Sequence, residues 1–137
     1  MAKCLEKNRY AVVTMLIPLL TAILLGLGAQ AGSNCGAISN SDMRYYCQGN
    51  CGAISNSDLR YFCGGSCGAI SNSDVRYFCR KSCGAISNSD LRYYCKGSCG
   101  AISSANTRYL CSRSCGSISD SDLRYFCSSG KKYPYVR

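Results

Sequence analysis

The chain has 137 residues, a formal net charge of +9, thirteen cysteines, and no histidine or tryptophan. Cysteine at nearly one residue in ten marks a disulfide scaffold in a short secreted chain. Without histidine, the chain lacks the side chain that most often acts as a general acid or base and that most often binds metals. The composition argues against hydrolases and zinc enzymes, and we expect a protein that is not an enzyme and uses no cofactor.

The first 31 residues have the pattern of a secretory signal peptide. Residues 1–9 are basic, residues 10–28 carry no charge, and Ala29-Gln30-Ala31 has small residues where signal peptidase reads them. Cleavage after Ala31 predicts a secreted or periplasmic protein. The uncharged stretch is also about long enough to cross a bilayer, so a retained N-terminal membrane anchor is the alternative. Cys4 leaves with the signal peptide, and the twelve remaining cysteines are an even number, as a fully oxidised framework requires.

A sixteen-residue repeat fills residues 35–127, after a short stub at 32–34 and before a basic, aromatic tail at 128–137. Each of the six units reads C-G-A-I-S-N-S-D-L-R-Y-F-C, and a variable three-residue spacer (QGN, GGS, RKS, KGS or SRS) joins it to the next. The fifth unit loses the acid and the aliphatic residue, and Leu110 replaces its second aromatic residue. This tolerance argues against an independent catalytic site in every unit.

Each unit contains the start signals of a short helix. Ser39 as N-cap and Asp42 at the third helical position fit a capping box, which places the start of the helix near Asn40. Tyr46 and Cys47 then follow Met43 at the i+3 and i+4 positions of one apolar face.

The end of the helix is harder to place from the sequence. Lys81 and Arg113 occupy the middle spacer position, where three other units have glycine, so that position should not require a positive φ. The invariant glycine after each first cysteine is the better candidate for a left-handed terminator.

These signals predict a small disulfide-rich, mainly α fold, a tandem array of six 16-residue short-helix repeats stacked into a rigid rod. The alternative is a β-solenoid with one coil per repeat, since Tyr, Phe and Cys suit strands. The S-N-S-D segment is poor strand material and no stretch alternates cleanly, so the sequence favours the helical array.

The twelve repeat cysteines are the candidate disulfide residues: Cys35, Cys47, Cys51, Cys63, Cys67, Cys79, Cys83, Cys95, Cys99, Cys111, Cys115 and Cys127. Pairing within each unit uses all of them, whereas pairing across the spacers strands Cys35 and Cys127. An alternating scheme, with Cys35 bonded to Cys51 and so on, also uses all twelve and stays open. We favour the bridge within each unit, where four extended residues span about 13 Å against about 12 Å of helix.

Adjacent arginine and tyrosine residues recur in every unit and form a candidate surface ladder. Its members are Arg44, Arg60, Arg76, Arg92, Arg108 and Arg124, with Tyr45, Tyr61, Tyr77, Tyr93, Tyr109 and Tyr125. An exposed ladder could bind anionic or glycan ligands through charge and stacking. The structural alternative is that an aspartate of one unit meets an arginine of the next and locks the register of the array.

The sixth unit, Cys115-Gly-Ser-Ile-Ser-Asp-Ser-Asp-Leu-Arg-Tyr-Phe-Cys127, resembles a loose group of small exported bacterial proteins with C-x-x-I-x-[DN]-x-D-x-R-x-x-C units. The resemblance covers nearly the whole mature chain and is weakest in the fifth unit. It implies export and repetition, and it implies no mechanism.

The predicted function is a structural or interaction role outside the cytoplasm. A basic mature chain fits an anionic polysaccharide, a lipid surface or an acidic protein, while nucleic acid fits the charge but not the compartment. Two alternatives are a cationic membrane- or envelope-active polypeptide, and a thiol metal-binding protein whose reduced cysteines hold copper(I) or zinc.

Overall fold

The computed structural model describes residues 34–135. The predicted signal peptide, its cleavage site and the alternative membrane anchor lie outside these residues. The description below concerns the compact unit formed by residues 32–137. Among the described residues, no helix is long and apolar enough to span a bilayer.

Every repeat folds into a one-turn 3-10 helix followed by a short α-helix. The 3-10 helices are η1 (Cys35–Ala37), η2 (Cys51–Ala53), η3 (Cys67–Ala69), η4 (Cys83–Ala85), η5 (Cys99–Ala101) and η6 (Cys115–Ser117). The α-helices are α2 (Ser41–Gln48), α3 (Ser57–Cys63), α4 (Ser73–Cys79), α5 (Ser89–Lys96), α6 (Ala105–Ser112) and α7 (Ser121–Cys127). Residues 34–135 contain no strand, so the predicted mainly α fold is confirmed and the β-solenoid alternative is wrong.

The helix N-cap lies one residue later than the sequence pattern predicted. Asn40, not Ser39, is the cap of α2, and its side-chain oxygen accepts a hydrogen bond from the backbone N–H of Met43. The same position caps all six helices, with serine in the fifth unit and aspartate in the sixth. Asn, Asp and Ser are equally good N-caps, and the capping-box interpretation failed because Asp42 has another partner.

The left-handed residue after each of the first five α-helices is the middle spacer residue, and not, as the sequence pattern predicted, the glycine after the next cysteine. This residue has a positive φ in all five spacers, including 60° at Lys81 and 59° at Arg113. The glycines that follow the first cysteines are not among the residues with a positive φ. Because a left-handed residue costs only about 1–2 kcal/mol, a lysine or arginine can occupy the position when the rest of the unit holds it there.

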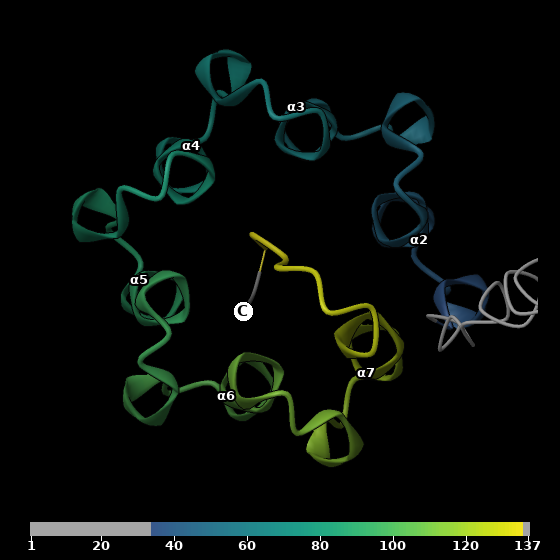
Figure 1. The fold of residues 1–137 in the computed structure, drawn as a ribbon, viewed down its shortest axis with the longest axis vertical. Helices are drawn as coiled ribbons and strands as arrows, with labels where there is room; N and C mark the ends of the chain where they lie inside the picture. The colour runs from purple at the N-terminus through teal and green to yellow at the C-terminus, as the bar shows by residue number, and fades with distance from the viewer. Residues whose placement is uncertain (1–33, 136–137) are drawn as a thin grey trace, which may run out of the picture. The chain divides into compact units, whose positions relative to one another are not determined.

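The six units form a closed ring rather than the predicted rod (Figure 1). Each α-helix contacts the next, and α7 contacts both α2 and η1, which completes the circle. The α-helices form the inner layer and the 3-10 helices the outer layer. Asp42, in the first turn of α2, bonds the backbone at the N-cap of α3, so neighbouring helix N-termini lie on the same face. All helices therefore point in one direction along the ring axis.

Two circles of apolar side chains make up the core of the ring. The isoleucine of each unit is 0–1% exposed: Ile38, Ile54, Ile70, Ile86, Ile102 and Ile118. Nearer the axis, the second aromatic residues contact their neighbours, for example Tyr46 with Phe62 and with Phe126 at ring-centroid distances of 5.8 and 5.7 Å. Each unit supplies too little apolar surface to fold alone, and the ring joins the six small contributions into one core.

Six disulfides link the first and last cysteine of every unit, as predicted. They join Cys35 to Cys47, Cys51 to Cys63, Cys67 to Cys79, Cys83 to Cys95, Cys99 to Cys111 and Cys115 to Cys127. Each bridge closes the 3-10 helix onto the end of the α-helix of the same unit. Disulfides of this kind are typical of proteins in an oxidising compartment.

Candidate interaction surface

The aspartate that recurs in five of the six units holds neighbouring units together. Both carboxylate oxygens of Asp58 accept hydrogen bonds, at 2.8 and 2.9 Å, from the backbone N–H groups of Ser71 and Asn72 in the next unit. Four more aspartates repeat this arrangement: Asp42, Asp74, Asp90 and Asp122. Asp122 closes the ring, because its partners are Ser39 and Asn40 of the first unit, at 2.7 and 2.8 Å.

The arginines of the predicted ladder act inside their own units. Arg44 Nη1 donates to the carbonyl oxygen of Ile38 at 2.8 Å, and the other five arginines bond the equivalent isoleucine at 2.7–3.2 Å. The structural alternative of an aspartate–arginine pair is therefore wrong, because the register lock pairs aspartate with backbone N–H groups of the next unit. This pairing could not be seen in the sequence because backbone donors leave no residue signature.

The tyrosines of the ladder lie on the ring wall beside these arginines. The first five arginine guanidinium groups lie 5.6–5.9 Å from the ring centroid of the following tyrosine, within the range of a cation–π contact. Most members of the ladder are half-buried, whereas Tyr61 and Arg124 are exposed. The structure thus brings the predicted Arg/Tyr pairs together, with the arginines partly committed to stabilising their own units.

The C-terminal tail, for which the sequence indicated no role, threads through the centre of the ring (Figure 1). On the side of the helix C-termini, Lys131 Nζ donates to the carbonyl oxygens of Tyr46 and Cys47 at 3.1 and 2.8 Å. On the side of the helix N-termini, the Tyr135 hydroxyl donates to the N-cap side chain of Asn56 at 3.1 Å. Between them Tyr133 is 8% exposed.

Aromatic contacts anchor the tail in the ring. The Tyr133 ring lies 5.3 Å from Phe126 and 6.1 Å from Tyr46, and the Tyr46 hydroxyl donates to the carbonyl oxygen of Lys132 at 2.8 Å. Burial raises the pKa of the Tyr46 and Tyr133 hydroxyls to about 12. The tail is therefore part of the core, and an aromatic, proline-containing end was the only sequence signal for it.

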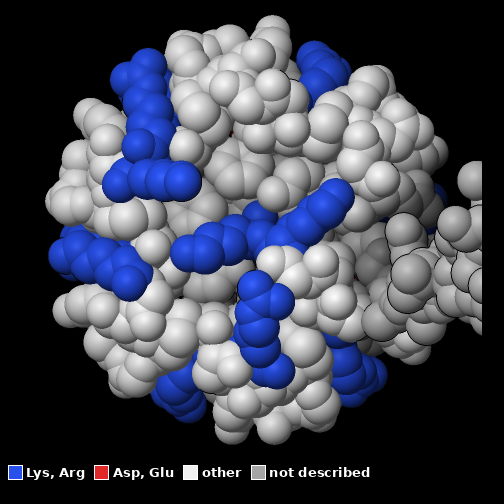
Figure 2. Space-filling view, in the orientation of Figure 1, with Lys and Arg blue, Asp and Glu red and all other residues white. Residues whose placement is uncertain are grey.

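The two faces of the ring differ in charge. The inter-unit aspartates lie in the first helical turns, at one face. The spacers follow the helix C-termini, at the other face, and three of them carry cations: Arg80, Lys81, Lys96 and Arg113. Lys131 and Lys132 join them near the axis, where they bond carbonyl oxygens at the helix ends. Figure 2 shows lysine and arginine side chains across one face, with no acidic side chain visible.

We call these six residues the basic face. Its cations lie in the variable spacers and the tail, whereas the invariant positions of the repeat build the ring. Among the described residues, no group of three or more His, Cys, Asp or Glu side chains could hold a metal ion. The twelve repeat cysteines are in disulfides, so none of them offers a thiolate. The comparisons with protein-family models, curated proteins and solved structures found no match for the chain.

Proposed function

We propose that this protein is an exported, disulfide-stabilised ring that binds an anionic polysaccharide through its basic face. The observation that carries the proposal is the separation of charge between the two faces. A surface of one sign attracts polyanions and orients the ring toward them. The disulfides and the signal-peptide pattern support a site of action outside the cytoplasm.

The distribution of apolar side chains favours a polysaccharide over a lipid bilayer. A polypeptide that inserts into the membrane interface needs a broad apolar face to bury among the acyl chains. Among the large apolar side chains of the described residues, Tyr61 has the greatest exposed fraction, 37%. The ring therefore offers charge without a broad exposed apolar face, which supports binding to a hydrated polyanion and argues against the membrane-active alternative.

The oxidised cysteines argue against the thiol metal-binding alternative. Copper(I) and zinc need thiolate ligands, and a disulfide sulfur is not one. A purified native protein with no free thiol in the repeats would exclude that alternative.

The proposal can be tested by salt elution from immobilised polygalacturonate, an acidic polysaccharide. A spacer variant replaces Arg80, Lys81, Lys96 and Arg113 with glycine, the residue found in the uncharged spacer of the second unit. We expect this variant to elute at a much lower salt concentration than the natural protein. Surface ion pairing is screened by salt, so the elution position reports the number of contacting charges.

A matched control lowers the net charge equally on the opposite face. It replaces Ser41, Ser57, Ser73 and Ser89, which are exposed first residues of α-helices, with aspartate. Negative charge is well tolerated at a helix N-terminus, so the ring should stay folded. The control should keep most of the affinity. Equal loss in both variants, or leakage of anionic liposomes by the natural protein at the same concentration, would contradict the proposal.

A further inference from the structure

The fifth unit leaves a hollow beside the axis of the ring. In the two preceding units, Phe78 and Tyr94 stack with their ring centroids 5.7 Å apart. The next aromatic position holds Leu110, whose side chain is smaller and has no ring to continue the stack. A pocket of about 230 Å³ lies here, lined by Tyr94 and Leu110, the cysteines at 99, 111 and 127, and residues of the spacer and tail.

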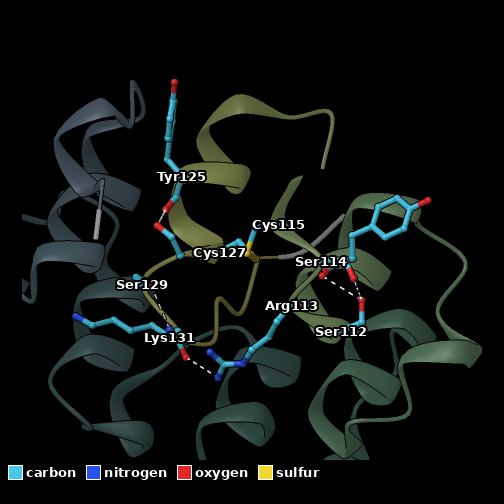
Figure 3. The surroundings of a disulfide bond; sticks show 11 residues. Ser112, Arg113, Ser114, Cys115, Tyr125, Cys127, Ser129 and Lys131 are labelled. Carbon is cyan, nitrogen blue, oxygen red and sulfur yellow. Dashed lines mark hydrogen bonds between the residues drawn. A yellow bond between two sulfur atoms is a disulfide. The ribbon is translucent and has the colours of Figure 1, made fainter. Parts of the chain in front are cut away.

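Two cations border this pocket with part of their hydrogen-bonding capacity in use. Arg113 Nη2 donates to the carbonyl oxygen of Gly130 at 3.1 Å, and Figure 3 shows its side chain directed toward the tail. Lys132 Nζ lies 5.6 Å from the ring centroid of Tyr94 and 3.4 Å from the carbonyl oxygen of Cys95. Lys131 also lines the pocket, but its amino group bonds the first unit. The described residues that line the pocket include no acidic side chain.

The left-handed turn at this pocket places Arg113 against the tail. Arg113 has a φ of 59°, and Gly130 opposite it has a φ of 71°. A Cβ atom at Gly130 would lie 3.0 Å from Arg113 Nη1, so the guanidinium packs directly over a position that glycine keeps open. The middle residue of every spacer shares this left-handed conformation, and at Arg113 it brings the guanidinium against the tail.

We propose that this pocket binds a small organic anion, a carboxylate carried on a flat apolar group. The planar guanidinium of Arg113 matches a carboxylate bidentately, and Lys132 adds a second positive charge. Tyr94 and Leu110 supply an apolar surface for the body of the ligand. The volume is below the 300–1,000 Å³ range of ordinary ligand pockets, which limits the ligand to about the size of a single aromatic ring. This site is independent of whether the basic face binds a polysaccharide.

The test is a titration of the oxidised full-length protein with benzoate, followed by NMR of the Leu110 methyl groups and of the backbone amides. We expect saturable shifts at residues 110–113 and 130–132, with a Kd near or below about 1 mM. Acetate lacks the apolar body and benzyl alcohol lacks the charge, so each should bind at least tenfold more weakly.

The repeat itself provides matched variants. Arg113→Gly and Leu110→Phe install residues that other units carry at these positions, so the ring should stay folded, and each should weaken benzoate binding at least tenfold. Lys81→Gly removes the equivalent charge and strain in the third unit, away from the pocket, and should leave the Kd within twofold. Absence of saturable shifts, equal binding of acetate, or equal loss in Lys81→Gly and Arg113→Gly would overturn the proposal.

Discussion

At the scale of single residues, the middle spacer position adopts a left-handed conformation that favours glycine, yet Lys81 and Arg113 occupy it in two of the five spacers. Replacing Lys81 with glycine should stabilise the ring by about 1 kcal/mol, because glycine adopts a positive φ without steric cost. The Lys81 side chain is exposed. Thermal unfolding of the oxidised protein, followed by circular dichroism, measures the change.

The converse substitution is the control. Gly65→Ala should destabilise the ring by a similar amount, because alanine is unfavourable at the positive φ of this position. A Cβ atom there meets no other atom within 4 Å, so a steric clash does not contribute. If Lys81→Gly and Gly65→Ala both had the stability of the natural protein, the middle spacer residue would not be in the left-handed conformation.

Asp90 should make the stability of the ring depend on pH in the acid range. The backbone N–H of Ser103, and then that of Ser104, holds the pKa of this carboxyl below its usual value. A lowered pKa in the folded state gives stability that is present above the unfolded pKa of about 4 and is lost as the pH falls through the folded pKa. Asp90→Asn should therefore flatten the fall of the unfolding temperature between neutral and acid pH. An unchanged pH profile would show that the carboxylate does not bridge the units.

At the scale of one element, the disulfide should dominate the stability of each unit. A bridge that closes a loop of this size contributes about 3 kcal/mol in the chain-entropy model. Replacing Cys67 and Cys79 together with serine should lower the free energy of unfolding by about that amount. Full reduction of all six bridges should abolish the helical circular dichroism signal. A helical signal unchanged by full reduction would contradict this account.

The interior of a unit could be predicted because its signals are local. The helix and its apolar face with Tyr46 and Cys47 follow from residue spacing. Spacing favoured the bridge from Cys35 to Cys47 but left the alternating scheme open, and the structure has the bridge within the unit. The cap and the terminator were misplaced because both depend on partners outside the local pattern. Asp42 bonds the next unit and is not available to close a capping box, and Lys81 is held in an unfavourable conformation by its surroundings.

At the scale of the whole molecule, the sequence predicted an array but not its closure. Whether identical units stack into a rod or a ring depends on the rotation from one unit to the next, which the repeat pattern does not encode in any single residue. The role of the tail was hidden for a related reason. The site that Tyr133 occupies exists only when all six units have closed around it.

The tail should therefore stabilise the closed ring. A chain that ends at Gly130 loses the contacts of Tyr133 with Phe126 and Tyr46, and the hydrogen bonds of Lys131 to the end of α2. Removing one buried aromatic side chain costs about 3–5 kcal/mol. We expect a clear fall in the unfolding temperature with all six disulfides intact. A truncated chain as stable as the natural protein would place the tail outside the ring.

The closed ring is the central claim, and Asp122 tests it most directly. Its carboxylate bonds the backbone N–H groups of Ser39 and Asn40, 83 and 82 positions away in the chain. In a two-dimensional NMR spectrum, Asp122→Asn should shift the amide signals of residues 39 and 40. The shifts should be as large as those that Asp58→Asn causes at residues 71 and 72. The array would be open if Asp58→Asn shifted the amide signals of residues 71 and 72 while Asp122→Asn left those of residues 39 and 40 unmoved.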